Sequence, residues 1–128
     1  MWRSFALALG LMLLGGCALM NEAEPPIDPH GYDEQGTASY YGARHQGKRT
    51  ASGERFDQNA LTAAHRRLPF GSKVLVTNLA NQKTVVVRIN DRGPHTRGRL
   101  IDVSRAAAEQ LGMIGSGTAR VRVQDLDD

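Results

Sequence analysis

Apolar and polar residues alternate along several short segments of the chain, and this pattern predicts a protein built mainly from β-strands. Residues 73–78 and 84–89 follow the two-residue period of a strand, and the stretch 78–82 between them is a natural hairpin connection. Residues 119–124 place valines on one face and arginines on the other. Further segments with strand character are 37–41, 61–64 and 100–103. Six such strands within about 90 residues favour a small closed β-barrel.

Only one segment has the pattern of a helix. Ser104 is suited to cap its N-terminus, residues 105–111 are good helix formers, and Gly112 is suited to end it. The predicted fold class is therefore an all-β barrel with one short helix.

The first 16 residues have the pattern of a secretory signal peptide. Arg3 is followed by an apolar run at 5–14, which is too short for a membrane span of about 20 residues. The run ends in LLGGC, residues 13–17, which resembles the bacterial lipobox. We expect Cys17 to be lipidated and to anchor the chain in a membrane, and the alternative is a leftover cysteine in a plain signal peptide. Since Ala18 and not an aspartate follows, we expect the outer membrane, with the protein facing the periplasm.

Residues 17–35 form an acidic, proline-rich stretch with little to bury, so we expect a flexible, disordered tether after Cys17. The folded domain is then expected at 36–128.

The charge and the histidine spacing limit the classes of function. Loss of residues 1–16 removes only Arg3, so the formal net charge of +3 becomes +2, which is too weakly basic for a typical nucleic-acid binder. A single cysteine has no partner for an internal disulfide. The spacing of the four histidines does not predict a metal site, and no cofactor is expected.

Several polar residues lie at the ends of predicted strands, and each has an ordinary structural interpretation. Glu54 can be a solvated loop charge, His65 a hydrogen-bonded structural histidine, and Asp91 a turn residue. Asp102 can prepare the helix start, while the Tyr40 and Tyr41 rings can simply pack. Together, two carboxylates and a histidine beside one cleft are suited to acid–base chemistry on a glycosidic bond.

Five motifs, in order, resemble those of the rare lipoprotein A (RlpA) family. The resemblance covers residues 36–126, and the motifs are GTASYYG (36–42), TASGERFD (50–57), LTAAHRRLPFGS (61–72), VRINDRGP (87–94) and LIDVS (100–104). It implies a six-stranded double-psi β-barrel and a septal lytic transglycosylase. Such an enzyme cleaves peptidoglycan between N-acetylmuramic acid and N-acetylglucosamine, without water, to 1,6-anhydromuramyl products. It prefers glycan strands that lack stem peptides. Many full-length members of the RlpA family also carry a C-terminal sporulation-related repeat (SPOR) domain, but this sequence stops just after the last predicted strand, so no such domain is expected here.

The resemblance also assigns roles to residues. Asp91 is expected to be the acid/base, Glu54 to stabilise positive charge or share the proton, and His65 to orient one of them. The roles of Asp91 and Glu54 can be exchanged, and Asp102 is expected to support the site, with Tyr40 and Tyr41 offering a sugar-stacking face. Guanidinium groups suit the lactyl carboxylates of stripped glycan. The candidate substrate-binding arginines are Arg55, Arg66, Arg67, Arg88 and Arg92.

Two other classes of protein stay open at this point. One is a non-catalytic, expansin-like peptidoglycan-binding lipoprotein, and the other is a structural envelope lipoprotein with a protein partner. We expect a monomer whose partners are glycan strands and, through Cys17, a membrane.

Overall fold

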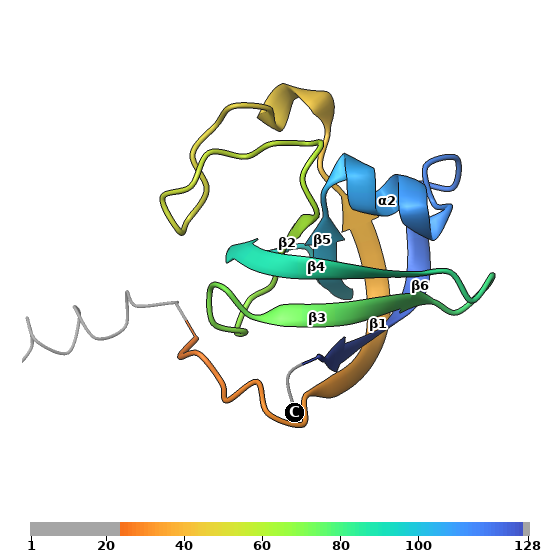
Figure 1. The fold of residues 1–128 in the computed structure, drawn as a ribbon, viewed down its shortest axis with the longest axis horizontal. Coiled ribbons are helices and arrows are strands. Elements are labelled where there is room, and N and C mark those ends of the chain that lie inside the picture. Colours follow the sequence, from red (N-terminus) through yellow and green to blue (C-terminus); the bar gives the residue numbers. More distant parts are fainter. Residues whose placement is uncertain (1–23, 127–128) are drawn as a thin grey trace, which may run out of the picture.

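The structure is a computed structural model that describes residues 24–126, and six strands within this range close into a barrel (Figure 1). The strands follow the order β1-β5-β2-β4-β3-β6 around the barrel. The predicted signal peptide and Cys17 lie outside the described residues. The elements are β1 (Asp33–Tyr40), the 3-10 helix η1 (Ala43–His45), β2 (Thr62–Ala64), β3 (Lys73–Asn78), β4 (Thr84–Asp91), β5 (Arg99–Val103), α2 (Arg105–Leu111) and β6 (Thr118–Asp125).

The strand order has an internal two-fold symmetry. If β1 is exchanged with β4, β2 with β5 and β3 with β6, the same pairs of strands remain neighbours around the barrel. The parallel pair β1–β5 then becomes the parallel pair β4–β2. Gly71 and Gly117, which precede the equivalent strands β3 and β6, both have positive φ, at 94° and 79°. Glycine adopts this conformation without steric cost. The six-stranded double-psi β-barrel with one short helix, as predicted, is confirmed.

The barrel core is made by the inward-facing residues of all six strands. Val74 and Val76 of β3 are fully buried, and their cross-strand partners Val87 and Val85 lie on β4. The two buried valines of β6 complete this wall, as the alternation at 119–124 predicted.

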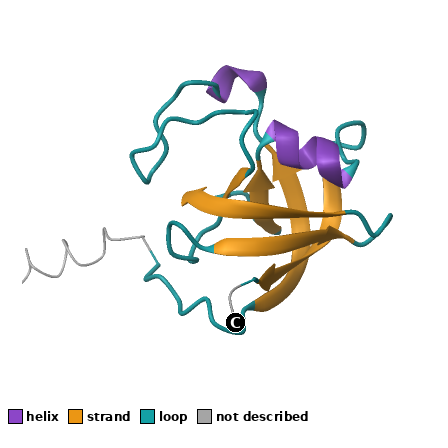
Figure 2. Cartoon of the chain, in the orientation of Figure 1, coloured by secondary structure: helices purple, strands orange, loops and turns teal. Residues whose placement is uncertain are grey.

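The short helix packs beside β4 and β1 (Figure 2). The Ser104 hydroxyl accepts a hydrogen bond from the Ala107 amide at 3.2 Å, and Gly112 ends the helix with a φ of 69°. Both predicted helix signals are therefore confirmed. No helix within residues 24–126 has the length and apolar character needed to cross a membrane.

The domain starts earlier than predicted. Residues 33–35 were expected in the flexible tether, but they belong to β1, and β4 also continues to Asp91. The preceding segment 24–32 contacts the barrel, because the Ile27 amide donates to the Arg67 carbonyl at 2.9 Å. Ile27 and Tyr32 pack against the core, so an acidic, proline-rich stretch contributes two apolar side chains that hold it in place.

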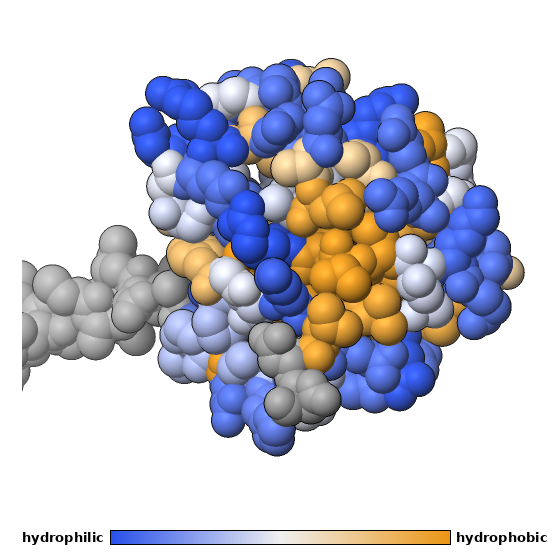
Figure 3. Space-filling model, in the orientation of Figure 1, coloured by the Kyte–Doolittle hydropathy of each residue, from blue (hydrophilic) through white to orange (hydrophobic). Residues whose placement is uncertain are grey.

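The outer face of the β3–β4 hairpin carries an apolar patch (Figure 3). Leu75 and Val86 are cross-strand partners there, and Val86 is 37% exposed. The predicted catalytic carboxylate lies at the far end of β4.

Candidate functional site

Asp91 occupies the last position of β4, where the sheet meets two long loops. Ala64 of β2 is the register partner of Asp91 on one side and of Asp102 on the other. The two aspartates therefore lie two strands apart, with β2 between them.

The Asp91 carboxylate is held by three hydrogen bonds. The amides of Ala51 and Arg92 donate to Oδ1, each at 2.9 Å, and the Tyr41 hydroxyl donates to Oδ2 at 2.6 Å. A backbone N–H can only donate, whereas a phenol hydroxyl can donate or accept. A proton on Asp91 therefore belongs on Oδ2, where the Tyr41 hydroxyl can turn to accept it.

Tyr41 itself is fixed by aromatic contacts. Its ring stacks on Phe56, with centroids 4.5 Å apart, and meets the His45 ring edge-on at 5.2 Å. Burial, followed by the hydrogen bond to Asp91, raises the pKa of Tyr41 well above its usual value. The hydroxyl stays protonated at neutral pH and remains available to Asp91.

Glu54 is an ion-paired carboxylate. Arg88 donates to both of its oxygens, at 2.8 and 2.7 Å, and the Asn90 side-chain amide donates at 3.3 Å. The Arg88 hydrogen bonds, helped by Asn90, lower the pKa of Glu54 to about 2. Glu54 is therefore ionised at neutral pH and is a poor source of a proton.

The His65 ring makes its hydrogen bonds away from both carboxylates. Its Nδ1 accepts from the amides of Arg67 and Leu68, at 3.0 and 3.1 Å, so Nε2 carries the proton in the neutral ring. Nε2 lies 2.8 Å from the Tyr32 hydroxyl, which donates in turn to Glu34. Burial lowers the pKa of His65 to about 4, so the ring is neutral.

The main chain of His65, in contrast, does reach Asp91. The His65 amide donates to the Asp91 carbonyl at 3.1 Å, and the Arg92 guanidinium donates to the His65 carbonyl at 3.2 Å. In this structure the contact between His65 and Asp91 is therefore made by the backbone of β2 and β4 and not by the imidazole.

Asp102 and Tyr40, which were also expected to support the site, make their contacts in different places. Asp102 accepts a hydrogen bond from Ser39, and Arg99 donates to the Ser39 hydroxyl at 2.9 Å. Tyr40 donates to the Ile114 carbonyl at 3.1 Å and packs against the core. The Tyr40 side chain therefore packs against the core, whereas the Tyr41 hydroxyl reaches Asp91.

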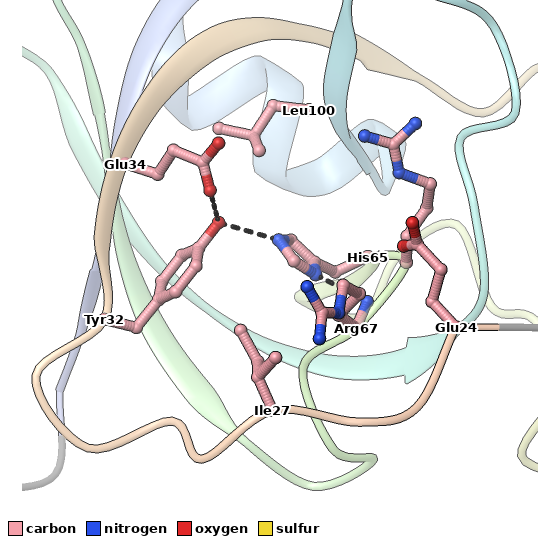
Figure 4. A pocket seen from close by; sticks show the side chains of 8 residues that line it. Glu24, Ile27, Tyr32, Glu34, His65, Arg67 and Leu100 are labelled. Atoms are coloured by element: carbon pink, nitrogen blue, oxygen red, sulfur yellow. Dashed lines mark hydrogen bonds between the residues drawn. The ribbon is translucent and has the colours of Figure 1, made fainter.

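The candidate substrate-binding arginines are mostly engaged within the chain. Arg55 donates to the Gly47 carbonyl at 2.9 Å, and Arg88 pairs with Glu54. Arg92 donates to two carbonyls and lies 4.0 Å from the centre of the Phe70 ring, and burial lowers its pKa. Arg66 and Arg67 instead line a pocket on the ring side of His65 (Figure 4).

Three elements of the site have no local sequence signal. The Tyr41–Asp91 and Ala51–Asp91 contacts join residues 50 and 40 positions apart, and the Glu34–Tyr32–His65 network begins in the expected tether. Tyr41 was predicted as a stacking residue, and its role as a hydrogen-bond donor to Asp91 follows only from the fold. Across residues 24–126, no three His, Cys, Asp or Glu side chains form a group able to hold a metal ion.

Comparison with known proteins gives the family of this chain. The sequence model of the lytic transglycolase family matches residues 33–123, and the chain therefore belongs to this family. The chain is 56% identical over 94 residues to the endolytic peptidoglycan transglycosylase RlpA of Pasteurella multocida. The aligned region covers 73% of this chain and 32% of that relative. The chain is 62% identical over 94 residues to the probable endolytic peptidoglycan transglycosylase RlpA of a Nostoc species, covering 72% and 25%. The predicted RlpA resemblance is confirmed, and the chain spans between a quarter and a third of the length of these relatives.

Two solved structures share the fold. The Streptomyces papain inhibitor aligns with a TM-score of 0.60 and 23% identity, covering 73% of this chain and 94% of the inhibitor. The apo form of an expansin from Clavibacter michiganensis aligns with a TM-score of 0.59 and 19% identity, covering 76% and 52%. These similarities support the barrel fold alone.

Proposed function

We propose that this chain is a peptidoglycan lytic transglycosylase. It cleaves the bond between N-acetylmuramic acid and N-acetylglucosamine, yields 1,6-anhydromuramyl ends, and prefers strands that lack stem peptides. The family membership and the names of the relatives support the reaction class. The observation that carries the proposal is the hydrogen bonding of the Asp91 carboxylate. Two backbone amides fix its Oδ1, while its Oδ2 contacts the Tyr41 hydroxyl, which can either donate or accept a hydrogen bond.

In the first step, Asp91 acts as the acid. The proton on Oδ2 passes to the glycosidic oxygen, the bond between this oxygen and the muramyl C1 breaks, and positive charge develops at C1. Asp91 is left as a carboxylate, and the Tyr41 hydroxyl turns to donate to Oδ2.

In the second step, Asp91 acts as the base. The oxygen of the muramyl 6-hydroxyl attacks C1 and closes the anhydro ring, and its proton returns to Oδ2 of Asp91. No water is consumed, and the enzyme regains its starting protonation state. One residue therefore serves both proton transfers.

Glu54 has a different part in this mechanism. Its pKa of about 2 supports assigning the proton to Asp91 rather than to Glu54. As a permanent carboxylate it stabilises the positive charge at C1, and its main chain orders the loop that supplies the Ala51 amide, because the Thr50 amide donates to the Glu54 carbonyl at 2.8 Å. His65 supports Asp91 through the backbone hydrogen bond described above.

Product analysis tests the proposal. Residues 18–128 would be incubated with sacculi stripped of stem peptides by an amidase, and 1,6-anhydromuramyl ends would be counted by mass spectrometry. We expect Asp91→Asn to lose at least about a hundredfold in rate, as general acid–base catalysis typically contributes about 10²- to 10⁴-fold. Asp57→Asn is the matched control, because Asp57 is exposed and accepts only a local hydrogen bond from the Asn59 amide.

Each outcome separates the candidate classes. Anhydro ends that depend on Asp91 and form faster on stripped than on intact sacculi support the proposal. If Asp91→Asn and Asp57→Asn bind glycan equally well and no anhydro ends form, the chain would instead be a non-catalytic, expansin-like binder.

We also propose that Cys17 is lipidated and anchors a monomer in the outer membrane, facing the periplasm. This rests on the LLGGC motif and on Ala18 after it. Mass spectrometry of the N-terminal peptide from cell membranes should find acyl groups on Cys17. An unmodified Cys17 peptide, or an equal distribution of wild type and Cys17→Ser in the soluble fraction, would contradict the anchor.

A further inference from the structure

Phe70 is an exposed aromatic side chain that the mechanism above does not use. It is 42% exposed, and it is the only aromatic residue among the large apolar side chains that are exposed within residues 24–126. It lies in the segment 65–72, which joins β2 to β3. Because Phe70 is not part of the barrel core, its ring is available to a ligand.

A tight turn holds Phe70 at its tip. The Ser72 amide and the Ser72 hydroxyl both donate to the Pro69 carbonyl, at 3.1 and 2.6 Å. Phe70 and Gly71 therefore occupy the two central positions of the turn. The Gly71 amide donates to the Ile89 carbonyl of β4 at 2.7 Å. The turn is thus fixed to β4 before a ligand arrives, so binding there needs little further ordering of the backbone.

One face of the Phe70 ring is covered by Arg92. The guanidinium carbon of Arg92 lies 4.0 Å from the centre of the ring. The carbonyls of His65 and Leu68 both accept hydrogen bonds from this guanidinium group, which holds it in place. The exposed part of Phe70 is therefore its other face and its edge, and the turn presents a flat, rigid, apolar surface to solvent.

This surface lies close to the candidate acid. Arg92 directly follows Asp91, so a single side chain joins the Phe70 ring to the end of β4. On its other side Asp91 contacts a second loop, because the Ala51 amide donates to its carboxylate. Figure 1 shows the end of β4 between the loop that carries Ala51 and the segment 65–72. A glycan strand that crosses the end of β4 from one loop to the other would reach both Asp91 and Phe70.

We propose that the free face of Phe70 is a sugar-stacking subsite for the glycan strand; the identity of this polymer rests on the proposed function. N-acetylglucosamine and N-acetylmuramic acid both carry axial C–H groups on the faces of the pyranose ring, and such a face packs on an aromatic ring. This contact needs neither a charge nor a stem peptide on the sugar. A sugar that is held on Phe70 positions a neighbouring linkage of the same strand at Asp91.

A tryptophan at position 70 reports this binding directly. The wild-type chain has one tryptophan, Trp2, so a fluorescence change that appears only in Phe70→Trp comes from position 70. The full-length chain would carry Asp91→Asn, which the proposed mechanism makes inactive, and would be titrated with soluble glycan strands that lack stem peptides. We expect a saturable change with Phe70→Trp and none with Asp91→Asn alone. A Phe70→Trp signal that does not respond or does not saturate would overturn the subsite.

Two variants separate the flat ring from apolar surface in general. Co-sedimentation with stripped sacculi would be measured for each variant in the full-length Asp91→Asn chain. We expect Phe70→Leu to weaken binding by about tenfold and Phe70→Tyr, which keeps the ring, to stay within about twofold. Val86→Ala is the matched control, because it trims a side chain that is 37% exposed on the outer face of the barrel. Equal binding by the leucine and tyrosine variants would overturn the proposal.

Kinetics distinguish a sugar contact from a role in holding Arg92. A contact made equally in the bound substrate and in the transition state predicts that Phe70→Leu raises KM about tenfold and leaves kcat nearly unchanged. A fall in kcat at unchanged KM would show that Phe70 only holds Arg92 beside Asp91, and would overturn the subsite.

Failure of the subsite and failure of the proposed function give different results. Saturable binding that depends on the ring, without anhydro ends from the wild type, would contradict the lytic reaction and support the subsite. Anhydro ends that form with the same KM in wild type and Phe70→Leu would overturn the subsite alone.

Discussion

Replacing Tyr41 by phenylalanine isolates the contact on which the proposed acid–base role of Asp91 depends. The variant removes one hydroxyl, which donates to Asp91 Oδ2 at 2.6 Å. The ring keeps its stacking on Phe56, with centroids 4.5 Å apart, so the loop that carries Phe56 should stay in place.

The size of the effect follows from the bond that is lost. A hydrogen bond to a charged group contributes about 1.5–3 kcal/mol, and about 1.4 kcal/mol of transition-state stabilisation corresponds to a tenfold change in rate. The rate should therefore fall by about ten- to a hundredfold, because Oδ2 loses the partner that holds it in place for proton transfer.

The assay is the initial rate of release of 1,6-anhydromuramyl ends from stripped sacculi, measured over the pH range in which the protein stays folded. Tyr40→Phe is the matched control, since its hydroxyl donates to the Ile114 carbonyl and not to the site. A Tyr41→Phe rate that equals the wild-type rate across this pH range would refute the proposed proton partner.

Three further predictions concern stability and charge. Burial lowers the pKa of His65 to about 4, so its contribution to the free energy of unfolding is fully present above pH 6.5 and is lost as the pH falls from 6.5 to about 4. The loss should be at most about 3 kcal/mol in urea denaturation. In His65→Gln the free energy of unfolding should depend less on pH over this range. The Arg88 hydrogen bonds lower the pKa of Glu54 to about 2, so Glu54 stabilises the fold above pH 4.5 and loses this contribution as the pH falls toward 2. The melting temperatures of the wild type and of Glu54→Gln should therefore differ at pH 6 and become equal as the pH approaches 2. A difference that grows as the pH falls would contradict the ion pair. In Gly36→Ala, the added Cβ would lie 2.7 Å from the Leu100 Cβ, so we expect the free energy of unfolding to fall by about 1–3 kcal/mol. Gly115→Ala is the control, because its added Cβ meets open space, and its stability should be nearly that of the wild type. Equal stabilities of the two variants would show that β1 and β5 are farther apart.

The sequence predicts most of the framework because its signals are local. The helix at 105–111 has its cap and its terminating glycine beside it, and β3 was predicted with its observed bounds because alternation alone defines it. The start of β1 was predicted late, because residues 33–35 are polar and pair only with a strand about 90 positions away, as in Asp33 with Gln124.

The site was predictable as a set of residues but not as an arrangement. Asp91 and Glu54 stand out only through the RlpA resemblance, and nothing in their spacing indicates that Arg88 pairs with Glu54 while Tyr41 bonds to Asp91. His65 lies in one of the same motifs, yet its ring bonds to a tyrosine from the segment that the composition predicted to be a free tether. Contacts between distant residues follow from barrel closure, which no local pattern records.

The most direct test of the account is to follow solvent oxygen during cleavage. Stripped sacculi would be digested by residues 18–128 in H₂¹⁸O, and the new muramyl ends would be weighed by mass spectrometry for wild type and Asp91→Asn. We predict anhydro ends without ¹⁸O in the wild type and almost none in the variant, because in the proposed mechanism the 6-hydroxyl and not water attacks C1 and Asp91 handles both proton transfers. New ends that carry ¹⁸O, or anhydro ends that form equally fast without the Asp91 carboxylate, would contradict it.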